Sequence, residues 1–267
     1  MYETIRYERD GHVGTLTLAR PKKLNAQSPL MWSELRELGS VLRGDESLRC
    51  LIVAGEGTSF SSGIDLQEGL TGMLGGMTEP RSQEADIDVG AGLAGTFMWI
   101  PDLHCPSVAA VRGYAYGAGL QLALACDFRV FGHDAKVGLL ETRYGLLPDM
   151  GATIRLPRII GESRAREMLL LGQIIDADEA YRIGLANRLV EAGDVDVEAA
   201  AFAALIATKP PLSLQGARRA LDVAWYSDPD TSLRVALTEQ IRCMRSEDFM
   251  EGLSALAEGR EPDWRGR

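Results

Sequence analysis

The sequence has 267 residues, of which 46% are hydrophobic and 25% are charged, a balance typical of a globular protein with one large core. Its formal net charge of −10 disfavours binding to nucleic acid, because neutralising phosphates requires a basic face. No apolar run reaches the roughly 18 residues that cross a bilayer, and the N-terminus alternates charged with apolar side chains instead of forming a signal peptide. We therefore expect a cytoplasmic protein without a membrane or nucleic-acid partner.

The cysteines and histidines do not indicate a metal site. None of the three histidines has a second ligand at helical or turn spacing. The four cysteines lie among apolar neighbours without paired spacing, which predicts reduced, buried thiols at Cys50, Cys105, Cys126 and Cys243.

In the first part of the chain, hydrophobic patterning predicts a hairpin, a helix and a buried strand. Thr4–Glu8 and Val13–Leu18 alternate apolar with polar residues on either side of a turn. Ser28 and Pro29 then supply an N-cap and a first helical residue, ahead of apolar residues that recur on one helical face. The uninterrupted apolar run Cys50–Ala54 predicts a strand buried on both faces, and a loop rich in glycine and serine follows it.

The next stretch is less regular. Residues 67–95 carry glycine, methionine and acidic residues without a clear period, so we expect a mobile segment beside a site and assign it no firm structure. Gly95–Asp102 is typical of the end of a helix, and Pro106–Val111 predicts another buried strand.

Residues 111–123 form a glycine-rich turn that leads into an apolar helix. Gly117 and Gly119 allow a sharp turn, and the first amides of the helix lack intrahelical acceptors. These amides lie at the positive end of the helix dipole, so they favour an anion: a nucleotide phosphate or the oxygen of a thioester enolate. The phosphate fits less well, because Leu122 replaces the third glycine of a dinucleotide motif and no P-loop lysine follows.

Strands and helices alternate through the middle of the chain, and helices alone follow. Strands at Asp127–Phe131 and near Lys136–Leu139, then a helix beginning near Asp149, predict an α/β fold. From about residue 196 the pattern is helical only, with candidate helices at Val197–Thr208, Leu212–Trp225, Thr231–Met244 and Asp248–Glu258. We predict an α/β core over residues 1–195 and a helical region over residues 196–267 that serves oligomerisation and covers the active site.

Several separate motifs, in order along the chain, resemble those of the crotonase superfamily, the enoyl-CoA hydratase/isomerase family. They are Arg20–Ala26, Phe60–Asp65, Leu140–Gly151, Ala180–Val190 and Phe249–Arg260. The resemblance implies a spiral of repeated ββα units with a helical C-terminal region, assembled into homotrimers or dimers of trimers. It also implies an acyl-CoA substrate of lipid metabolism, with coenzyme A as part of the substrate and no separate cofactor or metal.

The resemblance also implies roles for particular residues. The main-chain amides of Ile64 and Ala118 would hold the thioester oxygen, in agreement with the glycine turn. Family hydratases carry two glutamates, whereas this chain has Gln121 at the first position and Glu141 at the second. Because an amide cannot exchange a proton at neutral pH, Gln121 can orient a water or a carbonyl only. Coenzyme A contacts are implied for Lys22, Lys23, Ser61, Gly63, Asp65 and Leu66.

Asp149 supplies a second carboxylate. Dienoyl-CoA isomerases of the superfamily have a glutamate and an aspartate at the places of Glu141 and Asp149, although they carry an aspartate where this chain has Gln121. A chlorobenzoyl-CoA dehalogenase of the superfamily uses an aspartate matching Asp149 as a nucleophile, so nucleophilic attack stays open. We expect double-bond isomerisation of an enoyl-CoA or dienoyl-CoA. The alternatives are hydration through Glu141, hydrolysis or C–C cleavage of a CoA ester, and a catalytically silent CoA-binding subunit.

Each of these side chains also has a purely structural interpretation. Asp149, after a proline, is a good N-cap for a following helix. Glu141 can form a surface ion pair with Arg143 or Arg155. Gln121 can satisfy buried main-chain groups.

Overall fold

The computed structural model describes residues 2–69 and 82–267, and in that part strands and helices alternate before a purely helical end. The strands are β1 Ile5–Asp10, β2 Val13–Leu18, β3 Cys50–Gly55, β4 Ser107–Val111, β5 Tyr114–Tyr116, β6 Phe128–Gly132, β7 Lys136–Gly138, β8 Ile174–Asp176 and β9 Arg188–Val190. The helices are α1 Pro29–Leu42, α3 Gln83–Met98, α4 Ala118–Ala125, α5 Ala152–Ile160, α6 Glu162–Leu171, α7 Ala177–Arg182, α8 Val195–Ala207, α9 Pro211–Ala224, α10 Pro229–Met244 and α11 Glu247–Glu258. The α/β prediction is confirmed.

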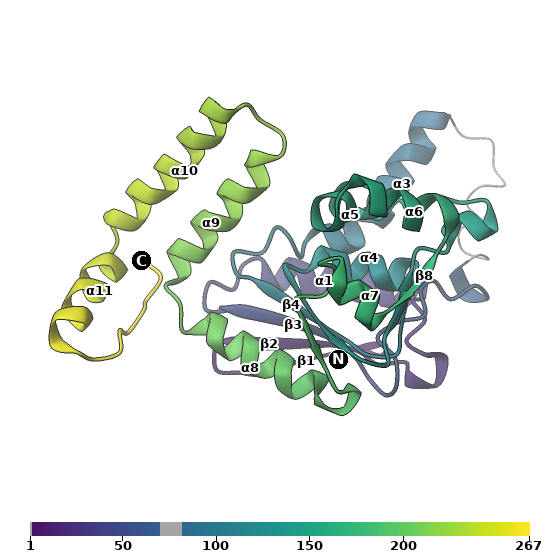
Figure 1. Ribbon diagram of the computed structural model, residues 1–267, viewed down its shortest axis with the longest axis horizontal. Helices are drawn as coiled ribbons and strands as arrows, with labels where there is room; N and C mark the ends of the chain where they lie inside the picture. Colours follow the sequence, from purple (N-terminus) through teal and green to yellow (C-terminus); the bar gives the residue numbers. More distant parts are fainter. Residues whose placement is uncertain (1, 70–81) are drawn as a thin grey trace.

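The main sheet has the order β1-β2-β3-β4-β6-β9. The hairpin β1–β2 is antiparallel, as predicted, and every later pair in this sheet is parallel. Helix α8 covers one face of this sheet, whereas α1 and α4 lie on the other (Figure 1). A parallel sheet covered on both faces requires apolar side chains on both sides of its strands.

Strand β3 shows how the apolar run serves both layers. Cys50, Ile52 and Ala54 pack in the cluster formed with α8, and Leu51 and Val53 pack in the larger cluster with α1 and α4. The side chains alternate because successive residues of a strand point to opposite faces. The predicted burial of this strand on both faces is confirmed.

Helix α1 begins as its sequence predicts. The Ser28 hydroxyl accepts a hydrogen bond from the amide of Met31 at 3.2 Å, and Pro29 occupies the first helical position. Met31, Leu35 and Leu38 are buried on one face of the helix. Capping, proline placement and apolar spacing therefore agree.

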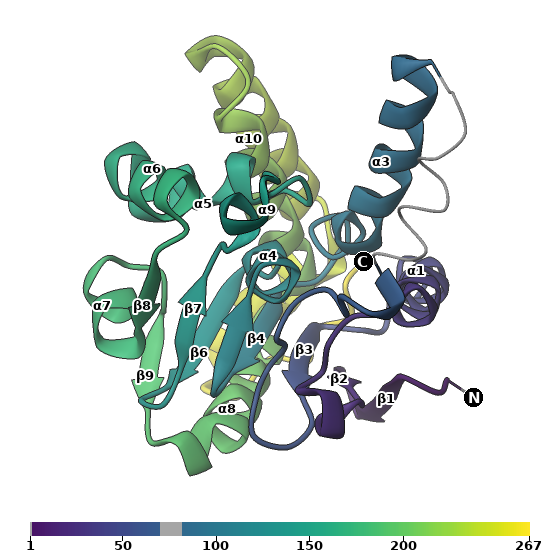
Figure 2. The same cartoon turned by 90° about the vertical axis from the view of Figure 1, so that its right-hand side faces the viewer.

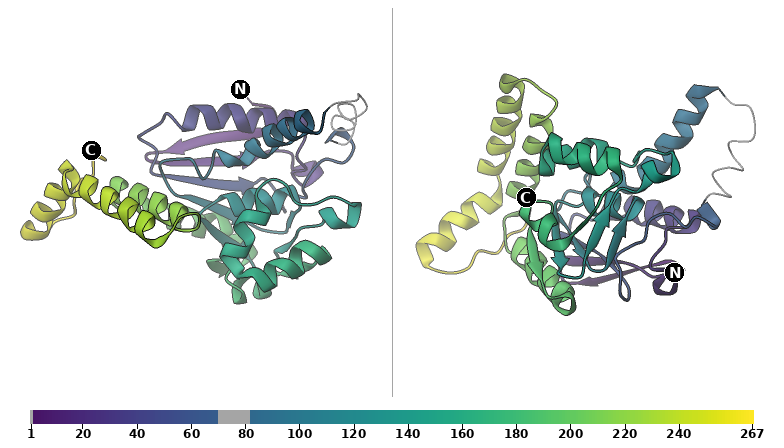
Figure 3. Two further views of the ribbon diagram at one scale, coloured as in Figure 1. Left: turned by 90° about the horizontal axis from the view of Figure 1, so that it is seen from above. Right: turned by 45° about the vertical axis from the view of Figure 1, so that its right-hand side comes forward.

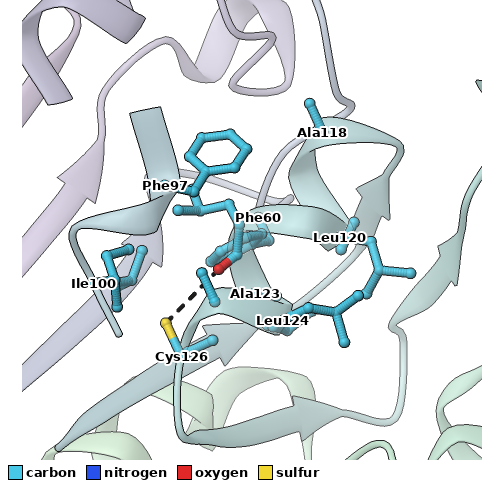
Figure 4. Packing of buried hydrophobic residues seen from close by; sticks show 14 of the residues in the cluster. Phe60, Phe97, Ile100, Ala118, Leu120, Ala123, Leu124 and Cys126 are labelled. Atoms are coloured by element: carbon cyan, nitrogen blue, oxygen red, sulfur yellow. Dashed lines mark hydrogen bonds between the residues drawn. The ribbon is translucent and has the colours of Figure 1, made fainter. Parts of the chain in front are cut away.

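A second, smaller sheet positions the turns discussed below. Its strand order is β5-β7-β8, with β5 and β7 parallel and Tyr116 opposite Gly138. Because parallel strands end at the same edge of a sheet, the chain leaving β5 towards α4 and the chain leaving β7 towards residue 141 emerge side by side. Helix α4 then runs into the larger core, where Figure 4 shows Phe60 and Ile100 beside Ala123 and Cys126.

Helix α3 spans Gln83–Met98 (Figure 2), so the predicted end of a helix within Gly95–Asp102 is confirmed. The structure differs from the sequence analysis in two other places. Residues 83–95 of the stretch 67–95, to which no firm structure was assigned, are helical. Residues 70–81 of that stretch lie outside the described part of the chain. Helix α5 begins at Ala152, three residues later than the predicted start near Asp149.

Helices α9, α10 and α11 extend beyond the sheet (Figures 1 and 3). We call these three helices the C-terminal arm. In α10, every residue of which is described, none is buried. Cys243 in α10 is only partly buried, so the predicted burial of all four thiols is wrong at this position, where the side chain lines an open cavity between α9 and α11. The division into residues 1–195 and 196–267 stays a prediction.

Within the described residues, no single helix is long and apolar enough to cross a membrane. The two consecutive helical segments 192–207 and 211–224 are long and apolar enough only when they are taken together, and the chain bends by 103° between them.

Candidate functional site

Two main-chain turns come together where β5 meets α4. Gly117 has φ 50° and ψ −120°, and helix α4 starts at the next residue, Ala118. Gly63 has φ +95°, and a Cβ placed on it would lie 2.7 Å from the carbonyl oxygen of Tyr116 and 3.7 Å from the amide nitrogen of Ala118. The chain around residue 63 therefore runs directly against the start of α4. Both conformations require the absence of a side chain.

The amides of Ile64 and Ala118 are two donors of this junction that have no acceptor in the described part of the chain. Among the hydrogen bonds of the described residues, neither main-chain N–H donates to a protein acceptor. Residue 64 is held by a parallel bridge to Gln27, whose amide donates to the Gly63 carbonyl at 2.7 Å and whose carbonyl accepts from the Asp65 amide at 2.9 Å. Free N–H groups on a fixed backbone can stabilise a negative oxygen without reorganising.

Buried polar side chains hold the loop that carries Ile64. Ser61 is fully buried, and its hydroxyl donates to the carbonyl oxygen of Asn25 at 2.8 Å. Asp65 accepts from Arg20 at 3.0 Å and faces the Lys23 ammonium at 3.6 Å. Burial works to raise the pKa of Asp65, but hydrogen bonds from the Glu68 amide and from Arg20 outweigh it and hold that pKa below its usual range. The Asp65 carboxylate is therefore a stable anchor for Arg20.

The six residues predicted to contact coenzyme A fall into two groups. Lys22, Lys23 and Leu66 are exposed, whereas Ser61, Gly63 and Asp65 lie in the buried loop. Their contact with coenzyme A stays a prediction. Sequence reasoning did not assign a role to Arg20, whose guanidinium also donates to the Ala26 carbonyl at 2.7 Å and so ties two segments of the site together. Its place within the motif Arg20–Ala26 was the available signal.

Glu141 lies beside Gly117, the residue before Ala118. It opens a short 3-10 turn, Glu141–Tyr144, shortly after β7, and its Oε1 atom is 3.4 Å from the position that a Cβ on Gly117 would take. Gln121 donates from Nε2 to Oε1 of Glu141 at 2.9 Å. The other carboxylate oxygen, Oε2, is buried and has no partner within the described residues. One oxygen of Glu141 is therefore held by a hydrogen bond, and the other is available to a bound group.

Two hydrogen bonds accepted by its side-chain oxygen fix the orientation of the Gln121 amide. Oε1 accepts from the amide of Met150 at 2.8 Å and from that of Ala152 at 3.3 Å. Nε2 must consequently face Glu141. The structural interpretation of Gln121, satisfaction of buried main-chain groups, is confirmed, and the same side chain also orients the carboxylate. Gln121 has one remaining N–H that can donate to a bound group, but it cannot accept a proton.

The structural interpretation of Glu141 is wrong. Within the described residues, Glu141 forms no ion pair: Arg143 donates instead to the carbonyl of Gly172, and Arg155 contacts the sulfur of Met98. Burial raises the pKa of Glu141, and the nearby charge of Asp149 raises it further against the opposing effect of the bond from Gln121. A carboxylate with a raised pKa can both take and return a proton near neutral pH.

Asp149 does not cap helix α5. The residue before the helix is Gly151, and no side chain forms a capping hydrogen bond there. Asp149 lies at an exposed position, and partial burial of its carboxyl raises its pKa. The charge of Asp149 contributes, after burial, to the raised pKa of Glu141. The fold thus assembles Ile64, Ala118, Gln121 and Glu141, with Asp149 at the edge.

Two main-chain donors near one oriented carboxylate form an arrangement that can stabilise an acyl oxyanion and move a proton next to it. A sequence model described as enoyl-CoA hydratase/isomerase matches residues 8–267. The chain is 34% identical to the carnitinyl-CoA dehydratase of Citrobacter koseri, with 100% of both chains covered. It is 31% identical to the crotonyl-CoA hydratase of Syntrophomonas wolfei, with 98% of both covered.

The structural comparison agrees with the sequence comparison. The crystal structure of an enoyl-CoA hydratase from Bacillus anthracis matches with a TM-score of 0.90 at 30% identity, covering 99% of this chain and 100% of that one. The chain belongs to the enoyl-CoA hydratase/isomerase family and has the crotonase fold. The resemblance seen in the sequence motifs is confirmed.

Proposed function

We propose that the protein isomerises the double bond of an acyl-CoA thioester, taking a 3-enoyl-CoA or a 3,5-dienoyl-CoA as substrate. The observation that carries the proposal is the hydrogen bond from the Gln121 side-chain amide to the carboxylate of Glu141. The amide holds Oε1 and leaves the buried Oε2 as a single reactive oxygen. A one-base site of this kind suits the transfer of a proton between two carbons.

The steps follow from the geometry. The thioester oxygen accepts hydrogen bonds from the amides of Ile64 and Ala118, which makes the C2 proton more acidic. Oε2 of Glu141 takes that proton, and the electron pair passes to the thioester oxygen as a dienolate. Glu141 then returns the proton at C4, which moves the double bond from C3 to C2. Two such amide donors contribute about 2.7–4 kcal/mol each to transition-state stabilisation.

The test uses two substrates. Incubation with 3-enoyl-CoA should raise the ultraviolet absorbance as the double bond becomes conjugated with the thioester, and incubation with 2-enoyl-CoA should leave the absorbance nearly unchanged. Rapid loss of the 2-enoyl absorbance without turnover of the 3-enoyl ester would show that the protein is a hydratase. Release of free coenzyme A from either ester would point to a hydrolase instead.

Substitution of Asp149 should affect turnover of the two proposed substrates differently. A 3,5-dienoyl-CoA must be protonated at C6, far from Glu141, and we propose that Asp149 supplies this proton. The Asp149→Asn variant should therefore lose about tenfold or more of its kcat with 3,5-dienoyl-CoA, since an acid–base group contributes at least that much. Turnover of 3-enoyl-CoA should change by less than about threefold. Equal losses on both substrates, measured by steady-state kinetics, would contradict this division of roles.

The rate should also depend on pH in a predictable direction. Burial raises the pKa of Glu141, so the active carboxylate is lost as pH falls, at a pH above the ordinary glutamate value of about 4.3. A profile of kcat/KM against pH should show this acidic limb displaced upward. A limb at or below the ordinary value would mean that Glu141 is not the base.

Hydration is the second candidate, and the names of the relatives favour it. The similar proteins are called crotonyl-CoA hydratase and carnitinyl-CoA dehydratase. In this reading Glu141 activates a water that the remaining N–H of Gln121 helps to orient. Hydrolysis or C–C cleavage, and a silent CoA-binding subunit, have no specific support from the geometry; binding of coenzyme A without turnover of any ester, unchanged in Glu141→Ala, would indicate the silent subunit.

We further propose that copies of the chain assemble through the C-terminal arm into a homotrimer or a dimer of trimers. Leu233, Leu237, Ile241 and Met244 recur along one side of α10 and are 47% to 59% exposed. A charge at Leu237→Glu should shift the assembly towards monomer in light scattering. Thr238→Glu places the same charge on another side of α10 and should leave the mass unchanged. A monomeric wild-type protein would contradict the proposal.

A further inference from the structure

A cavity of about 400 Å³ lies between α5 and the end of α9, apart from the groups that carry the proposed chemistry. Met98, Arg155 and Arg158 line it on one side, and Asp222, Trp225 and Tyr226 on the other. Arg155 and Arg158 are three residues apart on α5, so they lie on one face of that helix.

Neither arginine forms an ion pair with a carboxylate in the part of the chain that the structure describes, although the charge of Asp222 acts on both. Within residues 2–69 and 82–267, Nη1 of Arg155 is buried without a hydrogen-bond partner, and Nη2 contacts only the Met98 sulfur, at 3.4 Å. The guanidinium of Arg158 lies over the rings of Tyr226 and Trp225, at 4.2 and 5.3 Å from their centroids. A buried donor without an acceptor is unfavourable by about 1–3 kcal/mol, so it needs a compensating partner.

The other two arginines that line the cavity, Arg129 and Arg218, have acceptors for their N–H groups. Arg129 donates to the carbonyls of Leu185 and Cys126, and Arg218 is paired with Asp127 at 2.9 Å. Asp222 also lines the cavity, and the charges of Arg218, Arg155 and Arg158 act on it, but among the described residues it is not within ion-pair distance of Arg155. The unmet hydrogen-bonding capacity is therefore concentrated on Arg155.

The cavity lies close to the candidate site. The guanidinium of Arg155 occupies the space beside Gly151, where a side chain would otherwise stand. The residue before Gly151 is Met150, whose amide binds Gln121. The turn at Met150 and Gly151 therefore lies between Gln121 and Arg155.

We propose that this cavity binds the carboxylate group of a small molecule through Arg155, with Arg158 as a second cation. The carboxylate belongs either to the far end of an acyl group on coenzyme A or to a separate small molecule. Guanidinium groups recognise carboxylates through two parallel N–H donors, and stacking on aromatic rings fixes Arg158 without consuming those donors. The first source rests on the proposed function, whereas the second does not.

Calorimetry tests the binding without any turnover. Succinate titrated into the wild-type protein should bind saturably, while succinamide, which is neutral, should not bind at matched ionic strength. Arg155→Gln should weaken succinate binding about tenfold or more, as expected for the loss of a charge-assisted hydrogen bond. Arg164→Gln, which removes an exposed arginine from α6, should bind succinate like the wild type.

Kinetics then identify the source of the carboxylate. With two 3-enoyl-CoA esters of equal length, one ending in a carboxylate and one in a methyl group, wild-type kcat/KM should favour the carboxylate about tenfold or more. Arg155→Gln should remove this preference and leave the methyl-ended ester within about twofold of wild type. A thermal melt checks that the variant is folded. The comparison of the two esters on the wild-type protein does not depend on the folding of any variant.

The outcomes separate the two proposals. Succinate binding without a preference between the esters assigns the cavity to a separate carboxylate and supports the inference. If no enoyl-CoA is turned over at all, the proposed function fails, and calorimetry alone then shows whether the cavity binds a carboxylate. Absence of succinate binding together with equal use of both esters would overturn the inference.

Discussion

Replacing Glu141 by glutamine is expected to lower kcat with 3-enoyl-CoA by about 10²–10⁴-fold, the usual contribution of a positioned acid–base group. The amide keeps the size of the side chain and can still accept the bond from Gln121 through its oxygen. The free amides of Ile64 and Ala118 are untouched, so KM should change little. Steady-state kinetics with a direct binding measurement for coenzyme A check both statements.

Stability gives this variant an internal control. Because burial raises the pKa of Glu141, the folded protein holds the proton more tightly than the unfolded chain does. Its contribution to stability is complete below the unfolded pKa of about 4.3 and is lost as pH rises through the higher folded pKa. At neutral pH the neutral glutamine avoids this loss, so Glu141→Gln should melt at the same temperature as the wild type or higher.

A matched variant completes the experiment. Glu162→Gln changes an exposed glutamate on α6, paired with Arg166, and should alter stability by no more than about 0.5 kcal/mol and leave activity unchanged. An inactive Glu141→Gln with a lower melting temperature would indicate damage to the fold. Full activity in Glu141→Gln would remove Glu141 from the mechanism.

Sequence patterns correctly predicted the helices and strands that are determined by residues close together in the sequence. The Ser28 cap, the alternation of the hairpin and the apolar run of β3 each depend on neighbours in sequence, and each is confirmed. Strands β5, β8 and β9 have three residues each, too few to display a period, and were not predicted. Helix α3 contains Gly90, Gly92 and Gly95, and glycine is unfavourable in a helix by about 1 kcal/mol, so its pattern looked irregular.

The start of α5 could not be predicted because its cap is remote. Pro148 and Asp149 resemble the beginning of a helix, but the main-chain amides of Met150 and Ala152 are satisfied by Gln121, which lies 29 and 31 residues earlier. The same contact explains the candidate site. A glutamine that appeared to interrupt a pair of glutamates is the bridge between α5 and the carboxylate of Glu141. Spacing in sequence cannot reveal a bond between two turns that only the β5–β7 pairing brings together.

Replacing Gly63 by alanine should have an effect of comparable size by a different route. The new Cβ would lie 2.7 Å from the carbonyl oxygen of Tyr116, so the loop and β5 must move apart. This movement separates the amides of Ile64 and Ala118, and loss of one oxyanion donor lowers kcat by about 10²–10³-fold. The positive φ of Gly63 adds about 1–3 kcal/mol of backbone strain, which a thermal melt would detect.

Gly92→Ala is the matched control, because a Cβ on Gly92 in helix α3 meets no atom of the described residues within 4 Å. It should retain full activity and gain about 0.5–1 kcal/mol of stability, since alanine is the better helix former. If Gly63→Ala is folded at the assay temperature and still turns over 3-enoyl-CoA at the wild-type rate, the two amides do not act together on the thioester oxygen. If it is folded and inactive while Glu141 keeps its raised pKa, measured by NMR titration of the carboxyl carbon, the loss belongs to the amides and not to the base.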